Sequence, residues 1–176
     1  MNKSRWKTMN YMKIKKNSIA NFAGVSVSLY VSGCEFYCKN CFNRSSWNPK
    51  SGDEFTDEVK KEIFDELKKV YYDNFVILGG EPLLKHNLAD VTELAKEFKE
   101  LYPHKKLVIF TGNTFEQVAD YEVFKYTDYL IDGLFVEELY SPKLFFRGSS
   151  NQRIIDVQKS LKENETVLAL EYYEKN

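Results

Sequence analysis

Three cysteines within a short stretch constrain this chain more than any other feature. They are Cys34, Cys38 and Cys41, spaced C-x3-C-x2-C, and the 176 residues contain no others. The apolar run at residues 25–31 precedes them and is typical of a strand, and Gly33 allows the backbone to turn after it. The thiols are therefore predicted on a loop at the end of a strand, where they can converge on a soft metal centre.

Three thiols without a fourth limit the kind of metal centre. A structural zinc site takes four protein ligands, and the only histidines, His86 and His104, lie far along the chain. A disulfide framework needs an even number of cysteines. An iron–sulfur cubane normally takes four, so three would leave one iron open to a substrate or cofactor. The spacing favours a [4Fe–4S] cluster with an open iron, while unrelated thiols, or zinc completed by a distant histidine, remain alternatives.

A second motif, Gly79-Gly80-Glu81-Pro82, follows the next predicted strand. The apolar run at residues 75–78 is typical of a buried parallel strand. Two glycines at its end allow a ligand to approach the backbone, and Glu81 supplies an acceptor for an ammonium group. Alone, the motif also fits an ordinary strand-to-helix turn.

Together, the cysteine spacing and Gly79-Gly80-Glu81 resemble the radical S-adenosylmethionine (SAM) superfamily. The resemblance implies a [4Fe–4S] cluster held by the three cysteines, with SAM chelating the open iron through its amino and carboxylate groups. It also implies that the glycine–glycine–glutamate motif receives the SAM amino group. Many members carry an aromatic residue near the adenine, just before the third cysteine. Asn40 occupies that position here, and Phe42 and Tyr37 are the candidate rings.

Composition limits the location and partners of the protein. Its length predicts a single domain over residues 1–176, with residues 1–10 as a disordered tail. The formal net charge of -1, from 25 basic and 26 acidic residues, gives no electrostatic case for nucleic acid or an anionic membrane. The N-terminus lacks a signal peptide, and no run reaches the roughly 18 apolar residues of a membrane span. With free thiols, these features predict a cytoplasmic protein.

Hydrophobic periodicity predicts strands that alternate with helices. Strands are expected over residues 12–14 (at a sheet edge), 25–31, 75–78, 107–110 and 129–131. Expected helices are 56–72 capped by Thr56, one capped by Asn87, and a short one with a capping box of Thr114 and Gln117. The connections are long enough for parallel crossovers, so we expect an α/β fold with a mostly parallel sheet.

All candidate site segments fall at the carboxyl ends of expected strands. Beyond the two motifs above, these segments are Thr111-Gly112-Asn113 and Asp132-Gly133, each of which alone also fits a turn. Ligands bind at this edge of parallel α/β sheets, so Thr111 and Asp132 are candidate cofactor contacts. The superfamily resemblance implies a partial, open (β/α) barrel, although the chain is short even for six units.

The last third of the chain narrows the resemblance. The segments Leu130 to Gly133 and Arg147 to Arg153, with Trp47-Asn-Pro49, are similar to the activating proteins of anaerobic (class III) ribonucleoside-triphosphate reductases. This similarity covers about residues 10 to 158. It implies that Arg147 to Arg153 helps form a docking surface or shapes the mouth of the site, although the chemistry alone fits a polar surface loop.

The resemblance also implies a function. The cluster would accept an electron from a low-potential donor, flavodoxin or ferredoxin, and cleave SAM to methionine and a 5′-deoxyadenosyl radical. That radical would remove a hydrogen from one glycine Cα of a large glycyl-radical reductase. The alternatives are another activase, such as that of pyruvate formate-lyase, a small-molecule enzyme such as a deazaguanine synthase, or a ferredoxin-like electron carrier. An electron carrier would have no use for an open iron.

Overall fold

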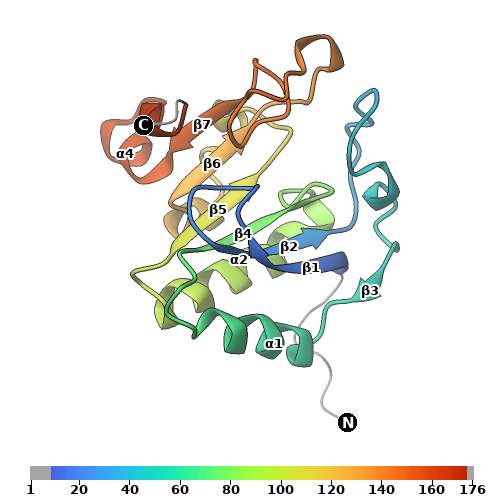
Figure 1. The fold of residues 1–176 in the computed structure, drawn as a ribbon, viewed down its shortest axis with the longest axis vertical. Coiled ribbons are helices and arrows are strands. Elements are labelled where there is room, and N and C mark those ends of the chain that lie inside the picture. Colours follow the sequence, from blue (N-terminus) through green and yellow to red (C-terminus); the bar gives the residue numbers. More distant parts are fainter. Residues whose placement is uncertain (1–8, 174–176) are drawn as a thin grey trace.

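A computed structural model describes residues 9–173 of the protein (Figure 1). The described residues form one seven-stranded sheet in the order β3-β1-β2-β4-β5-β6-β7. The central strands β2, β4, β5 and β6 are parallel, whereas β1, β3 and β7 pair antiparallel at the two edges. The strands are β1 (Asn10–Ser18), β2 (Ser26–Val31), β3 (Asp53–Glu54), β4 (Asn74–Gly79), β5 (Lys106–Phe110), β6 (Tyr129–Asp132) and β7 (Arg153–Asp156). The expected α/β class with an open, largely parallel sheet is confirmed.

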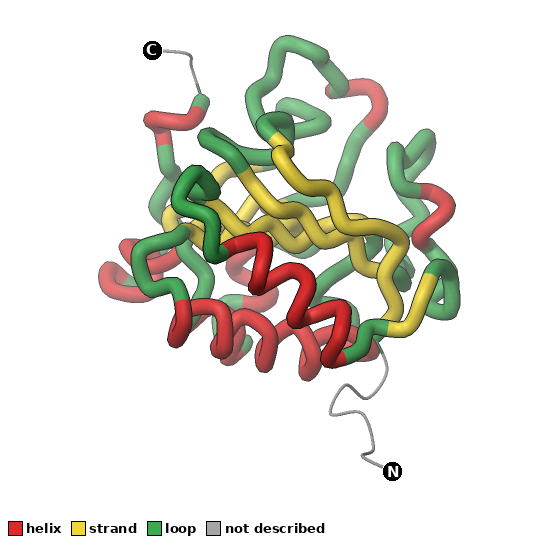
Figure 2. The backbone as a smooth tube through the Cα atoms, turned by 60° about the horizontal axis from the view of Figure 1, so that its bottom comes forward, coloured by secondary structure: helices red, strands yellow, loops and turns green. Residues whose placement is uncertain are grey.

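The two longest helices lie together on one face of the sheet (Figure 2). They connect parallel neighbours, because a parallel pair cannot be joined by a tight turn. The helices are α1 (Asp57–Leu67), α2 (Lys85–Leu101), α3 (Phe115–Val118) and α4 (Val157–Glu163), with 3-10 helices η1 (Arg44–Ser46), η2 (Glu122–Lys125), η3 (Glu137–Leu139) and η4 (Leu170–Tyr172). No helix within residues 9–173 has both the length and the apolarity needed to cross a membrane.

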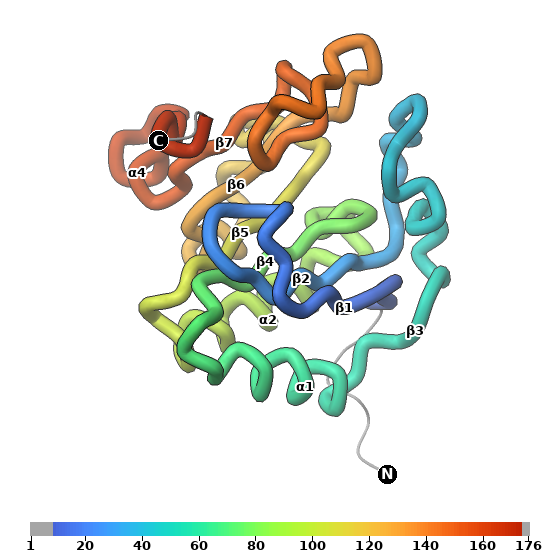
Figure 3. Tube along the Cα trace, viewed as in Figure 1, coloured from blue at the N-terminus to red at the C-terminus, as the bar shows by residue number. Residues whose placement is uncertain are grey.

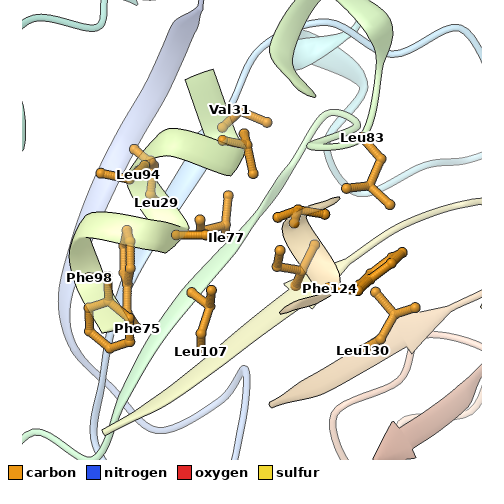
Figure 4. Packing of buried hydrophobic residues seen from close by; sticks show 14 of the residues in the cluster. Leu29, Val31, Phe75, Ile77, Leu83, Leu94, Phe98, Leu107, Phe124 and Leu130 are labelled. Atoms are coloured by element: carbon orange, nitrogen blue, oxygen red, sulfur yellow. The ribbon is translucent and has the colours of Figure 1, made fainter. Parts of the chain in front are cut away.

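The main core lies between the sheet and these helices (Figure 4). Leu94 and Phe98 of α2 pack against Leu29, Phe75 and Ile77 of the sheet, and all five side chains are fully buried. Burying one such side chain stabilises the fold by roughly 1.5–3 kcal/mol, so this layer fixes the parallel strands in register. The carboxyl ends of the strands are thereby held at one edge.

A second, smaller cluster covers part of the opposite face. Phe22, from the β1–β2 connection, packs on Tyr172 of the C-terminal segment with ring centroids 4.7 Å apart. Leu78 and Phe110 belong to this face as well, and both also line a pocket at the carboxyl ends of the strands. The pocket therefore occupies the part of this face that the small cluster leaves uncovered.

Two predicted capping arrangements are confirmed. The side chain of Thr56 accepts a hydrogen bond from the Val59 N–H, and Thr114 with Gln117 forms the reciprocal capping box. The first helix is shorter than predicted, because it ends at Leu67 and leaves Val70 96% exposed.

Other sequence predictions need correction. Asn87 is not a cap: it lies inside α2, and its buried amide donates to the carbonyl oxygens of Ser32 and Glu81. The expected edge strand at residues 12–14 is longer, and β7 was not anticipated. The expected tail, residues 1–10, lies mainly outside the described residues, but its last two belong to the fold. Met9 is buried and Asn10 begins β1.

Candidate functional site

The three cysteines lie on the thiol loop, residues 33–43, which leaves the carboxyl end of β2. Its first residues are fixed by backbone hydrogen bonds to the segment after it: Gly33 N–H donates to the Ser46 oxygen at 2.7 Å, and Cys34 N–H to the Trp47 oxygen at 3.0 Å. All three thiols are free and half-buried, and all three line one pocket. The structure thus brings the predicted ligands to a common space.

The donor set fits a cluster better than a single ion. No group of three or more cysteine, histidine or acidic side chains within the described chain is arranged to hold one metal ion, and neither histidine lines the thiol pocket. A cubane takes each thiolate on a different iron, so its ligands need not meet at a single point. Burial raises the pKa of the Cys34 thiol to about 11, so ligation at neutral pH must displace its proton.

The glycines at the carboxyl end of β4 form the second wall of the pocket. Gly80 N–H donates to the Val31 oxygen at 2.8 Å, and Glu81 N–H donates to the Gly33 oxygen at 2.7 Å. A Cβ atom on Gly80 would lie 2.5 Å from that Gly33 oxygen, so only glycine allows the two loops to approach this closely. The motif therefore supports the thiol loop directly as well as lining the pocket.

The Glu81 carboxylate joins the ends of β4 and β5. It is 2% exposed and accepts hydrogen bonds from Leu83 N–H (2.9 Å), the Thr111 hydroxyl (2.8 Å) and Gly112 N–H (2.8 Å). Burial raises its pKa to about 7, and these three donors act in the opposite direction. Thr111, a predicted cofactor contact, lines the pocket. The Glu81 carboxylate uses much of its acceptor capacity in hydrogen bonds within the protein.

The third wall is the segment between β6 and β7. Gly133, Phe135, Gly148 and Gln152 line the pocket. The Gln152 side chain ties this wall together: its oxygen accepts from Gly148 N–H at 2.8 Å, and its amide donates to the Gly133 oxygen at 2.9 Å. A hydrogen bond from the Phe135 backbone to the Cys38 thiol joins this wall to the thiol loop and partly offsets the effect of burial on the pKa of Cys38.

Similarity to known proteins places this pocket in a family. Residues 20–155 match the 4Fe-4S single cluster domain. The chain is 38% identical over 146 residues to the anaerobic ribonucleoside-triphosphate reductase-activating protein of Enterobacteria phage T4. This alignment covers 83% of the present chain and 93% of the phage protein. Proteins of the same name from Vibrio cholerae and Escherichia coli K12 are 35% and 33% identical, with 97% and 96% of their lengths covered. The chain belongs to the anaerobic ribonucleoside-triphosphate reductase-activating protein family.

Only some of the residues that were predicted to contact the cofactor line the pocket. Phe42 lines the pocket and packs on Phe135, with ring centroids 5.2 Å apart. Tyr37 does not line the pocket, but it packs edge-on against Trp47, which does. The Asn40 amide donates to the Glu137 carboxylate and does not line the pocket.

Asp132 is also outside the pocket wall. Its buried carboxylate pairs with Arg153 and accepts from the Phe115 N–H at 2.7 Å, so it anchors the start of α3 and the β7 edge. Its position after a strand predicted a site residue, but proximity to Arg153 was not visible in the sequence.

Sequence reasoning missed the aromatic residue Phe36, which lines the pocket. Its ring lies so close to Gly112 that a Cβ atom there would be 2.5 Å away. Phe36 lies between the first two cysteines, and that position on a loop expected to hold a cofactor could have identified it. Phe110, the last residue of β5, was missed as well, because its apolar character predicted only core packing.

The two arginines of the Arg147 to Arg153 segment face the protein. The Arg147 guanidinium lies 4.0 Å from the centroid of the Tyr173 ring and donates to the Gln152 carbonyl oxygen. Arg153 also forms paired hydrogen bonds with Glu116 at 2.8 and 3.0 Å. Gly148 and Gln152 shape the pocket, as expected of the mouth of a site, but the cations are engaged internally.

Proposed function

We propose that this protein activates an anaerobic ribonucleoside-triphosphate reductase by generating a glycyl radical in it, through reductive cleavage of SAM at a [4Fe–4S] cluster. The observation that carries the proposal is that the three thiols, Gly79 to Glu81 and Thr111 line one pocket. The names of the relatives support the reductase as the target.

The cysteines have the role of cluster ligands in this proposal. Cys34, Cys38 and Cys41 would hold the cluster and would leave one iron open for SAM. Bound together, the cluster and SAM supply one electron and a cleavable carbon–sulfur bond, which is chemistry that no side chain provides.

The other pocket residues bind and orient SAM. Gly79 and Gly80 receive its amino group, with Glu81 as an acceptor that also fixes the position of Thr111. Phe42 and Thr111 border the adenosine, while Asn40 and Asp132 act from outside the pocket by holding its walls in place. The apolar side chains of Phe36, Phe110 and Phe135 exclude water from the reacting atoms.

Two protein partners follow from this function. One is the large glycyl-radical reductase that carries the target glycine. The other is a low-potential electron donor, flavodoxin or ferredoxin, which reduces the cluster. Free thiols persist in a reducing compartment, so the proposal includes a cytoplasmic location.

The test starts from anaerobically reconstituted protein. We expect about four irons per chain, formation of 5′-deoxyadenosine from SAM with dithionite, and a glycyl radical signal on the cognate reductase by electron paramagnetic resonance. Cys38→Ala should abolish all three, whereas Ser45→Ala, on the exposed surface after the thiol loop, should retain them. Zinc in place of iron after anaerobic purification, with no cluster on reconstitution, would contradict the proposal.

The remaining functions are distinguished by substrate. A glycyl radical on pyruvate formate-lyase but not on the reductase would identify a different activase. Turnover of a free deazapurine precursor without any protein radical would identify a small-molecule enzyme. A stable cluster that is unchanged spectroscopically by SAM would favour an electron carrier.

A further inference from the structure

Exposed apolar side chains lie beside the thiol pocket. They come from two loops that extend beyond the carboxyl ends of the strands (Figure 3), the thiol loop and the segment of residues 134–140. We call this set the apolar rim: Phe36 (37% exposed), Phe42 (69%), Leu134 (42%), Leu139 (43%) and Tyr140 (48%). Such exposure is costly for side chains of this size unless another surface covers them.

Side chains of the two loops meet in the rim, although the loops are about 100 residues apart in the sequence. The Phe42 ring packs against the Tyr140 ring with centroids 5.7 Å apart. The side chains of Phe36 and Leu134 both lie against the pocket residue Gly112, which places them beside each other. Phe36 and Phe42 also line the pocket, so the rim continues directly into it.

Three of the charged side chains beside the rim are paired with each other. Lys39 of the thiol loop lies 2.8 Å from the Glu137 carboxylate and 3.4 Å from that of Glu138. Arg147 contacts the Tyr173 ring and Arg153 pairs with Asp132, so neither arginine presents a free positive charge to a partner at this opening. An aromatic, apolar surface with few unpaired charges is the composition of the centre of a protein–protein interface.

We propose that the apolar rim is the docking surface for the segment of the reductase that carries the target glycine. The inference rests on the proposed function, in which a backbone Cα of another protein has to reach the pocket. Any such segment must cross the rim, because the rim borders the opening. Glycine offers no side chain to recognise, so recognition must come from the residues on either side of it. The rim fits an extended segment with apolar side chains and no net charge next to the glycine.

A matched pair of double variants tests the rim. Leu139→Ser/Tyr140→Ser removes an aliphatic and an aromatic side chain that lie outside the pocket wall. Val70→Ser/Tyr71→Ser removes the same kind of pair from the exposed turn after α1, where Val70 is 96% and Tyr71 49% exposed. Affinity for the cognate reductase is measured anaerobically by biolayer interferometry, and 5′-deoxyadenosine formation with dithionite is measured without the reductase.

The expected result is a loss of affinity of about tenfold or more in the rim variant only, with a matching fall in glycyl radical yield. Its 5′-deoxyadenosine formation should equal that of the wild type. Unchanged affinity would overturn the docking surface while leaving the proposed function intact. Equal loss of affinity and of 5′-deoxyadenosine formation would also overturn it, because the rim would then serve the fold or the SAM site. If the wild type produces no radical on the reductase, the proposed function itself fails.

A second measurement does not depend on removing contacts. A photo-crosslinking benzoylphenylalanine replaces Tyr140 in one protein and Tyr71 in another. We expect a covalent adduct with the reductase from position 140 only, mapped by mass spectrometry to the glycine-bearing segment. No adduct from position 140, or adducts of equal yield from both positions, would contradict the proposal. A wild-type dimer that the rim variant converts to a monomer would assign the rim to a second copy of this chain instead.

Discussion

The thiol loop presents its reactive side chains to the pocket, whereas residues 147–153 turn their cations into the protein. Both segments lie at the same end of the sheet and both carry the residues most characteristic of the family. The three thiols line the pocket, and within the described part of the chain no lysine or arginine lines it with them. Arg153 pairs with the buried Asp132, and Arg147 covers the Tyr173 ring. A reactive or charged side chain is available to a ligand only where the fold has not already given it a partner.

The difference follows from what each side chain costs when buried. An ionised carboxylate as enclosed as Asp132, which is 1% exposed, needs a cation or several hydrogen-bond donors, and Arg153 supplies both to it. A thiol is a small, weakly polar group that is tolerated half-buried without a partner. It therefore remains available for iron.

The largest effect is expected when the thiol loop is separated from the Gly79–Glu81 segment that holds it. Gly80→Val places a branched side chain on the Gly33 carbonyl oxygen, so the two loops must separate. We expect iron content after reconstitution to fall below about a tenth of the wild-type value, along with SAM cleavage. Ala89→Val, on the exposed side of α2, is the control and should load iron normally. Wild-type iron content in Gly80→Val would show that the loop contact is dispensable.

The next effect tests whether Arg153 serves the fold. Arg153→Met leaves the Asp132 carboxylate buried without its cation, and we expect the free energy of unfolding to fall by about 3 kcal/mol. Urea denaturation of the protein without cluster measures this loss. Lys61→Met, which removes an exposed ion pair with Asp65, should change stability by less than about 0.5 kcal/mol. If Arg153→Met retains full stability but loses affinity for the reductase, the arginine is a docking residue after all.

Two carboxyl groups, Glu81 in the pocket and Glu116 beside Arg153, should make the stability of the protein depend on pH in opposite directions. Burial raises the pKa of Glu81 above its usual 4.5 to about 7, so its contribution to stability is complete below pH 4.5 and is lost as the pH rises through 7. The Arg153 guanidinium lowers the pKa of Glu116 to about 2, so that contribution is present above pH 4.5 and is lost as the pH falls through 2.

Denaturation of the protein without cluster at several pH values checks both contributions. Between pH 4.5 and 7 we expect the Glu81 contribution to fall by up to about 3 kcal/mol, and Glu81→Gln should remove this dependence. Arg153→Met should instead remove the acid-side dependence that comes from Glu116. The same pH profile in Glu81→Gln as in the wild type would show that Glu81 is not the group responsible.

The smallest effect concerns the ion pairs that join the two loops of the rim. Lys39 is 72% exposed where it meets Glu137, and exposed pairs contribute little because water screens them. Lys39→Ala should leave the urea midpoint of unfolding unchanged within error. Affinity for the reductase should change by less than about threefold, since the rim contacts are apolar. A loss as large as that of the double variant Leu139→Ser/Tyr140→Ser would mean that charge, rather than apolar contact, dominates docking.

The sequence by itself determined the parts that depend on neighbours in the chain. The spacing of the cysteines and the glycines after β4 identified the type of site, because both express local backbone needs. Thr56 and the Thr114–Gln117 pair were predicted correctly for the same reason, since a cap satisfies backbone groups within its own first turn. Alternating apolar runs were sufficient to predict the parallel strands.

Only the tertiary structure decided which polar groups face the pocket. Asn87 was predicted to cap a helix, but its amide donates to the Ser32 and Glu81 carbonyl oxygens. Asp132 was predicted to contact the cofactor, but its carboxylate pairs with Arg153. These pairings join residues between 6 and 55 positions apart. Local propensity does not contain them, because they arise only when the sheet brings separate strand ends together. The same process gathers the apolar rim from two distant loops, which no single stretch of sequence reveals.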